Sequence, residues 1–192
     1  MAKGASVIKI LAFNGSPRIG GNTDDMIDQI LAGARTKQVA VEKVNLNALK
    51  MDGCQAMESC RKTGVCAHVD AFTPYYKKID EADCLVIASP IYMGRVTGQM
   101  KCFLDRLYPY IDENFKSRMR PGKKAVVAML WAASSEGAGR QEVEYWSGYF
   151  SVHMKVAAQI GFPGMAKIGA FRKDSRAMTE AYNAGVKLVG GG

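Results

Sequence analysis

Several features that would assign this chain to a common functional class are missing. No apolar stretch is long enough for a membrane span, and no block of like charges occurs. Its two histidines, His68 and His153, are far apart and have no carboxylate motif beside them, so they predict no metal site. The apolar run at residues 7–13 has no small-residue cleavage site behind it, unlike a secretory signal. We therefore expect a cytoplasmic protein with no membrane partner.

The number of cysteines and the charge further limit the kinds of site and partner that we expect. Five cysteines, an odd number, favour reduced thiols or metal ligands over a disulfide framework. The net charge is +8, which suits an anionic partner. Because Lys and Arg are scattered along the sequence, we expect most of them to lie on a solvated basic surface. Aromatic residues are not interleaved with the basic ones, and no helix-turn-helix or RNA motif is present, so we expect no nucleic-acid partner.

The length of 192 residues, with 48% hydrophobic residues, predicts one domain over residues 1–192. No internal repeat or linker divides it. Short apolar runs predict strands at 7–13, 39–46, 84–89, 124–131 and 165–171. Helical spacing of apolar residues predicts helices at 22–34, 72–81, 98–110, 141–160 and 174–189.

This alternation of strands and helices predicts an α/β fold. Its single doubly wound parallel sheet has five strands, helices on both faces and right-handed crossovers. The connection at about residues 47–71 is too long for an ordinary loop and contains cysteine, glycine and charge. Long loops of this kind usually have a function.

The loop at residues 15–23 follows the first strand, where a doubly wound sheet binds its ligands. Its glycines let the backbone approach an anion, its polar side chains supply donors, and a helix N-terminus follows. The residues concerned are Gly15, Ser16, Arg18, Gly20, Gly21, Asn22 and Thr23. Neither the dinucleotide nor the triphosphate loop motif is present, which leaves a monophosphate, and the alternative is a capped turn without a ligand.

A second stretch decides between these alternatives. Together with Asn14-Gly15-Ser16-Pro17-Arg18 and Gly21-Asn22-Thr23, residues 89–106 resemble the flavodoxin-like FMN reductases. That family comprises NAD(P)H-dependent FMN and quinone reductases and also includes the iron–sulfur flavoproteins. The resemblance is close over about residues 7–110 and looser to the end.

The resemblance implies strand order 2-1-3-4-5 and an FMN cofactor. It implies that Ser16, Arg18, Asn22 and Thr23, with Gly21 of the same loop, hold the phosphate. It also implies that a run of five residues lines the isoalloxazine ring through backbone contacts: Pro90, Ile91, Tyr92, Met93 and Gly94. That run can offer an apolar surface and backbone polar groups to a flat ring.

A third loop, residues 131–139, is small and polar and follows the fourth predicted strand. The family places its remaining flavin contacts there, although this sequence departs from the commonest family pattern. We predict contacts from Ala133 and Gly137, while Trp131 either covers the ring or simply ends the strand.

The long insertion carries Cys54-x2-Met57-x2-Cys60-x5-Cys66. In the iron–sulfur flavoproteins, a similar run of four cysteines holds a four-iron cluster. Met57 stands at the second ligand position, and a neutral thioether is a weak ligand in such a cluster. We therefore predict no iron–sulfur cluster, and Cys54, Cys60 and Cys66 remain candidate ligands if Cys84, Cys102 or a partner chain supplies a fourth.

These observations predict an FMN-dependent oxidoreductase that passes electrons from NADPH or NADH to a small acceptor, such as a quinone or free flavin. The flavin carries the chemistry, so we predict no catalytic side chain. The resemblance implies a homodimer or homotetramer. The main alternative is a flavodoxin-type or iron–sulfur flavoprotein electron carrier, which the basic charge disfavours.

Overall fold

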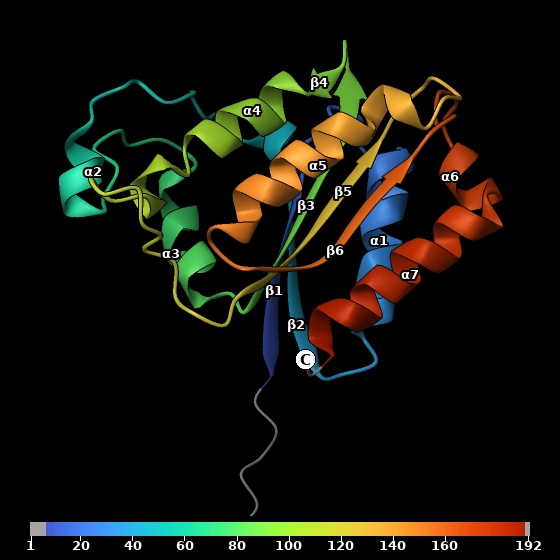
Figure 1. The fold of residues 1–192 in the computed structure, drawn as a ribbon, viewed down its shortest axis with the longest axis horizontal. Coiled ribbons are helices and arrows are strands. Elements are labelled where there is room, and N and C mark those ends of the chain that lie inside the picture. Colours follow the sequence, from blue (N-terminus) through green and yellow to red (C-terminus); the bar gives the residue numbers. More distant parts are fainter. Residues whose placement is uncertain (1–6, 191–192) are drawn as a thin grey trace, which may run out of the picture.

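The computed structural model describes residues 7–190, and it contains an open sheet with helices packed on both faces (Figure 1). The strands are β1 (Ile8–Asn14), β2 (Val39–Asn45), β3 (Cys84–Tyr92), β4 (Arg95–Val96), β5 (Lys124–Leu130) and β6 (Lys155–Phe162). The α-helices are α1 (Asn22–Ala34), α2 (Ser59–Thr63), α3 (Thr73–Glu81), α4 (Gly98–Asp105), α5 (Gly137–Ser151), α6 (Ala170–Lys173) and α7 (Ser175–Val189). The 3-10 turns η1 (Leu46–Ala48) and η2 (Tyr108–Tyr110) follow β2 and α4.

The sheet confirms the predicted α/β fold class. Its parallel strands run in the order β2-β1-β3-β5-β6. Counted along the chain, this is the predicted order 2-1-3-4-5. The short strand β4 pairs antiparallel with the end of β3. Because the chain reverses its direction of winding between β1 and β3, the carboxyl ends of these two strands border a switch point.

Alternate residues of β1 point to the two faces of the sheet and build two separate cores. Leu11 and Phe13 pack against residues of α3, α4 and α5. Ile10 and Ala12 pack against residues of α1 and α7 on the opposite face. Figure 1 shows this division, with α1 and α7 on one side of the strands and α4 and α5 on the other.

Helices α1 and α7 cross at two glycines. A Cβ at Gly33 would lie 1.9 Å from the carbonyl oxygen of Tyr182, and a Cβ at Gly185 would lie 1.8 Å from that of Ile30. No side-chain rearrangement relieves a contact with backbone atoms. The absence of both side chains therefore allows these helices to pack backbone against backbone.

The sequence prediction is wrong over residues 141–171. Helix α5 ends at Ser151, and the fifth parallel strand is β6, not residues 165–171. The latter segment crosses the carboxyl edge of the sheet as a loop and the start of α6. Other elements differ at their ends, because β3 continues to Tyr92 and α4 stops at Asp105.

The cysteine-containing insertion, residues 47–71, is largely irregular and contains η1 and the short helix α2. It lies beyond the end of α4, close to α3 (Figure 1). Within residues 7–190, no helix combines the length and the apolar character that crossing a membrane requires.

Candidate functional site

A cavity of about 210 Å³ lies at the carboxyl ends of β1, β3 and β5. The predicted residues that line it are Ser16, Arg18, Gly21, Asn22, Thr23, Pro90, Ile91 and Tyr92. The structure thus brings together two stretches of sequence that are almost 70 residues apart. Leu130, Trp131 and Ala132 line it from the end of β5, and Met165, Ala166 and Ile168 form the remaining wall. Four predicted residues do not line it, namely Met93, Gly94, Ala133 and Gly137.

Two buried polar residues shape the loop after β1. Asn14 accepts a hydrogen bond from the backbone N–H of Ser16 at 2.8 Å and donates one to Asp24 Oδ1 at 3.0 Å. Asp24 Oδ2 accepts from the backbone N–H of Gly20 at 2.6 Å, where φ is +68°. Sequence reasoning did not identify Asn14 or Asp24 as organisers of this loop. The available signal was an Asn directly before the first Gly and an Asp in the first helical turn.

The N-terminus of α1 opens into the cavity. Gly21 occupies the N-cap position, and no side chain caps the helix. A helix without a side-chain cap has free N–H groups in its first turn, and its dipole favours negative charge there. Thr23 is almost fully buried at this point, whereas Arg18 is exposed beside it. These groups together form a site suited to an anion.

Asn22 lines the cavity, and its side chain makes hydrogen bonds within the chain. Its side-chain amide donates to the carbonyl oxygens of Met165 at 3.0 Å and Lys167 at 2.8 Å. Its Oδ1 accepts from the N–H of Phe171 at 3.3 Å. Both amide hydrogens are therefore used to hold the segment 165–171 against the start of α1. This segment is a wall of the cavity that the sequence analysis assigned to a strand.

The stretch after β3 forms a two-residue hairpin turn. Tyr92 pairs with Arg95, and the residues between them have positive φ, +51° at Met93 and +81° at Gly94. Two positive φ values are typical of a type I′ turn, in which glycine is favoured. Met93 adopts this conformation despite its side chain, at a cost of about 1–2 kcal/mol. Its side chain is fully exposed, and Tyr92 is partly exposed beside the cavity.

Direct hydrogen bonds join the first two loops. The N–H of Gly15 donates to the carbonyl oxygen of Ala88 at 2.8 Å, and the hydroxyl of Thr97 donates to the carbonyl oxygen of Gly15 at 2.7 Å. The Thr97 hydroxyl also accepts from the N–H of Met100, which caps α4. The anion loop and the hairpin are therefore fixed to one another through the start of α4.

In the third loop, Trp131 directly follows β5 and is buried, although it contributes to the lining of the cavity. Its indole N–H donates to the carbonyl oxygen of Ser135 at 2.8 Å. Ala133 and Gly137 are both exposed, and the carbonyl oxygen of Ala133 accepts from the N–H of Gly164 at 2.9 Å. The loop is thus tied to the segment that leads into the 165–171 wall.

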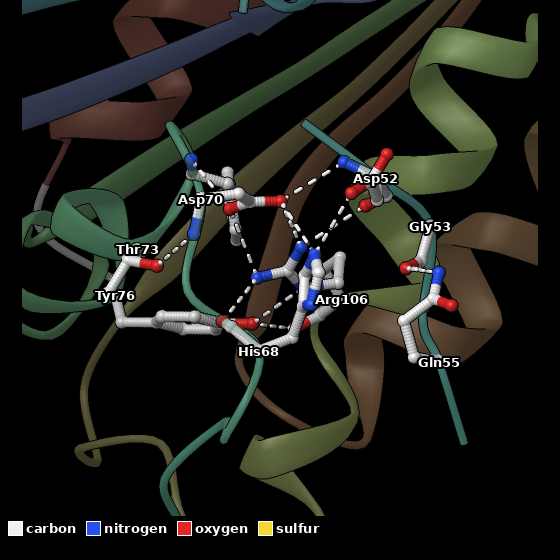
Figure 2. A network of polar contacts seen from close by, with 9 residues as sticks. Asp52, Gly53, Gln55, His68, Asp70, Thr73, Tyr76 and Arg106 are labelled. Atoms are coloured by element: carbon white, nitrogen blue, oxygen red, sulfur yellow. Dashed lines mark hydrogen bonds and ion pairs between the residues drawn. The ribbon is translucent and has the colours of Figure 1, made fainter. Parts of the chain in front are cut away.

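The cysteine insertion is held by one buried arginine. Arg106, at the end of α4, is 1% exposed and binds Asp70 through two nitrogens, at 2.5 and 3.2 Å. It also donates to the carbonyl oxygens of Asp52 and His68, at 3.1 and 3.2 Å. Figure 2 shows these groups converging on the guanidinium from both ends of the insertion. Burial opposes the charge of Asp70, but these bonds hold its pKa below the usual value.

All five cysteines are free thiols. In the insertion, Cys54 is exposed, Cys60 is buried and Cys66 is half-buried. Burial raises the pKa of the Cys60 thiol, and the neighbouring Cys66 and Cys54 add to this effect. Met57 is 54% exposed. Cys102 is the thiol outside the insertion that approaches it, because its Sγ lies 3.7 Å from the Cβ position of Gly53.

A larger cavity, of about 900 Å³, opens between β4, α4 and α5. Its walls include Tyr108, Tyr145, Trp146 and Tyr149, and Cys54 lies at its edge. The uncapped N-terminus of α1 does not border it. We therefore take the smaller cavity as the functional site, because the anion-binding groups converge there.

Comparisons with known proteins agree on one family. The family model described as NADPH-dependent FMN reductase matches residues 8–163. An iron–sulfur flavoprotein from Methanocaldococcus jannaschii is 26% identical over 190 residues, which cover 95% of this chain and 96% of that protein. Another, from Methanosarcina thermophila, is 26% identical over 146 residues, or 76% of this chain and 74% of the relative.

The fold also has solved relatives. The NAD(P)H:quinone oxidoreductase from Methanothermobacter marburgensis superposes with a TM-score of 0.75. The two chains are 15% identical, and the match covers 97% of this chain and 98% of the other. At this identity the likeness concerns the fold.

Proposed function

The chain belongs to the NADPH-dependent FMN reductase family, and from that premise we propose that its FMN binds in the cavity at the carboxyl ends of β1, β3 and β5. Family membership makes the chain an NAD(P)H-dependent flavin oxidoreductase. The observation that carries the placement is the convergence of two motifs on one cavity. Residues 16–23 and 90–92 line it together, beside an uncapped helix N-terminus.

In this proposal the phosphate lies at the start of α1. The hydroxyls of Ser16 and Thr23 and the backbone N–H groups of Gly21 and the first helical turn bind its oxygens. Arg18 adds positive charge from the rim. Asn22 contributes through its backbone and by fixing the 165–171 wall, since its side-chain amide is already engaged.

The flavin ring lies toward the hairpin. Pro90, Ile91 and Tyr92 line the cavity on that side. The turn residues Met93 and Gly94 follow Tyr92, and in this proposal they offer backbone groups to the ring. We keep Ala133 and Gly137 of the third loop as predicted flavin contacts, although they do not line the cavity. The cavity is smaller than the roughly 300–1,000 Å³ usual for ligand pockets, so part of the ring extends beyond it.

Three large apolar side chains of these loops are exposed, namely Ile168, which lines the cavity, Ile19 in the loop after β1 and Met93 in the hairpin turn. Exposed apolar residues gathered at a ligand site favour cover by another molecule. We propose that a second copy of the chain supplies this cover in a homodimer or homotetramer.

FMN, when bound, supplies the redox chemistry by accepting hydride from the nicotinamide and passing electrons to the acceptor. The chain's own residues bind and orient it. The hydrogen bonds of Asn14 and Asp24 fix the conformation of the loop after β1 in the chain alone, which would reduce the entropy lost when the cofactor binds. We assign no side-chain acid or base.

The net charge of +8 favours NADPH, with its additional phosphate, over NADH. We propose a small acceptor such as a quinone or free flavin. The cytoplasm remains the predicted compartment, and residues 1–192 remain a predicted single FMN-binding unit.

We do not include an iron–sulfur cluster, although the similar archaeal proteins carry that name. The insertion offers three thiols, of which one is exposed, and the neutral thioether of Met57 at the second ligand position. This donor set does not fit a cluster that needs four thiolates.

Anaerobic reduction tests the proposed function. Protein loaded with one FMN per chain is mixed with NADPH or NADH, and the flavin absorbance is followed before and after a quinone is added. We expect either nicotinamide to bleach the flavin, with a higher kcat/KM for NADPH, and the quinone to restore the colour. Loaded protein that stays oxidised with both nicotinamides contradicts the proposal and favours an electron carrier.

A further inference from the structure

The hairpin that presents Met93 and Gly94 has little support of its own. Strand β4 is two residues long, and it pairs with β3 only through Ile91–Val96 and Tyr92–Arg95. So short an antiparallel pair is marginally stable without further packing. Another element must therefore hold the turn in place.

That element is α5, through Glu142. Glu142 is 3% exposed, and its Oε1 accepts from the backbone N–H of Val96 at 2.9 Å. The same oxygen accepts from the indole N–H of Trp146 at 2.9 Å, and Oε2 accepts from Arg95 Nη1 at 3.0 Å. A buried carboxylate is costly unless hydrogen bonds compensate it, and two of these three bonds come from the return strand of the hairpin.

Helix α5 is itself fixed against the cavity. A Cβ at Gly139, three residues before Glu142, would lie 2.4 Å from the ring of Trp131 and 2.7 Å from Ile91 Cδ1. The helix therefore packs directly on two residues that line the cavity. The position of Glu142 relative to the cavity wall is set by this contact.

We propose that Glu142 is a positioning residue that fixes the Tyr92–Arg95 turn where it meets the flavin ring. The inference rests on the proposed function for its ligand, but the hydrogen bond to Val96 exists in the chain alone. The three donors contribute unequally. Arg95 is 76% exposed in its side chain, so its ion pair is screened, whereas the bond to the backbone of Val96 acts directly on the turn.

Two conservative variants of Glu142 show whether it acts by holding the turn in position or by its negative charge. Glu142→Gln removes the charge but keeps an oxygen that can accept from Val96 and Trp146. Glu142→Asp keeps the charge but is one methylene too short to reach Val96. If Glu142 acts by position, the Asp variant is the more damaging, and Arg95→Ala resembles the Gln variant. Glu144→Ala, on the exposed face of the same helix, is the matched control.

The readouts are hydrogen exchange at the Val96 amide in flavin-free protein and the FMN dissociation constant. We expect Glu142→Asp to speed Val96 exchange and weaken FMN binding by about tenfold or more, the equivalent of one hydrogen bond. Exchange at the β5 amides should stay unchanged. Glu142→Gln, Arg95→Ala and Glu144→Ala should remain within about threefold of the wild type.

Three results would overturn the inference. The first is weaker FMN binding in Glu142→Gln than in Glu142→Asp, and the second is an unchanged rate of Val96 exchange in both variants. The third is faster exchange throughout the sheet. The last indicates a purely structural residue. If the wild type binds no FMN, the proposed function fails, but Val96 exchange still reports whether Glu142 holds the turn.

Discussion

The side-chain amide of Asn22, at the start of α1, donates a hydrogen bond to the carbonyl oxygen of Met165 at 3.0 Å. A residue from the loop at residues 15–23 thereby holds residues 165–171, the wall on the other side of the cavity. A second link runs parallel to it, between Arg172 and the buried carboxylate of Asp25 at 2.6 Å. We therefore expect ligand binding at the start of α1 to be coupled to the position of residues 165–172.

Replacing Asn22 by Asp should release this wall. A carboxylate cannot donate to the carbonyl oxygens of Met165 and Lys167, and it adds negative charge beside the phosphate site. We expect the free energy of unfolding to fall by about 1–3 kcal/mol and the FMN dissociation constant to rise at least tenfold. Hydrogen exchange of residues 165–171 reports the release directly. Asn183→Asp, on the exposed side of α7, is the control, and unchanged exchange in Asn22→Asp would refute the coupling.

The glycine pair between α1 and α7 gives a second prediction. Gly33→Ala or Gly185→Ala places a methyl group within 2 Å of a backbone oxygen, so the two helices must separate. We expect each change to cost more than about 3 kcal/mol of folding free energy, measured by urea unfolding. Gly148→Ala in α5 is the matched control. It has open space around it and should stabilise the chain by about 0.5–1 kcal/mol. Wild-type stability in Gly33→Ala would show that the helices do not pack this closely.

These two contacts mark the limit of what the sequence predicts. The strand at residues 8–14 and the helix at 22–34 were predictable because apolar runs and helical spacing are local signals. The bond from Asn22 to Met165 joins residues 143 positions apart, and no local pattern encodes it. The amide of Asn22 was therefore predicted to serve a ligand rather than the chain.

The error over residues 141–171 has a physical cause. Strand β6 lies at the edge of the sheet and is only partly buried, with alanines at 157 and 158 that favour helix. No proline separates it from α5, so the helical pattern continues through it in the sequence. The conspicuous Pro163-Gly164 turn follows this strand and does not precede it. Residues 155–162 form a strand because they pair with β5 at the edge of the sheet, and this pairing is not visible in the local sequence.

The buried pair of Arg106 and Asp70 predicts a dependence of stability on pH. Burial acts to raise the pKa of Asp70, but hydrogen bonds from Arg106 and from the backbone N–H groups of Asp52 and Phe72 outweigh it. Because the folded-state pKa lies below the unfolded value, this stability is present above about pH 4 and is lost as the pH falls further. Asp70→Asn should lose about 3–5 kcal/mol at pH 7 and become less sensitive to pH below 4.

Urea midpoints measured between pH 2 and 7 check this prediction. The control is Asp105→Asn, which removes an exposed ion pair with Lys101 and should change stability by less than about 1 kcal/mol. Equal effects of the two substitutions would mean that Arg106 does not depend on Asp70 to hold the insertion.

We expect that one substitution in the cysteine insertion allows it to bind an iron–sulfur cluster. The wild type should take up no cluster after anaerobic reconstitution with iron and sulfide, whereas Met57→Cys completes a four-thiol set and should bind about four irons per chain. Val69→Cys, an exposed position in the same insertion, controls for an added thiol. A wild-type chain that binds four irons would contradict this account and point to Cys102 as the fourth ligand, given its approach to Gly53.

The FMN dissociation constant of the flavin-free protein, measured by quenching of flavin fluorescence, tests directly whether the flavin binds in the cavity at the carboxyl ends of β1, β3 and β5. We expect one FMN per chain in the wild type and a dissociation constant about ten- to a hundredfold higher in Thr23→Val, which removes a buried hydroxyl from the proposed phosphate site. Thr179→Val, an exposed change on α7, should bind FMN like the wild type. A wild type that binds no FMN, or a Thr23 variant that binds it equally well, would contradict the placement of the flavin in this cavity.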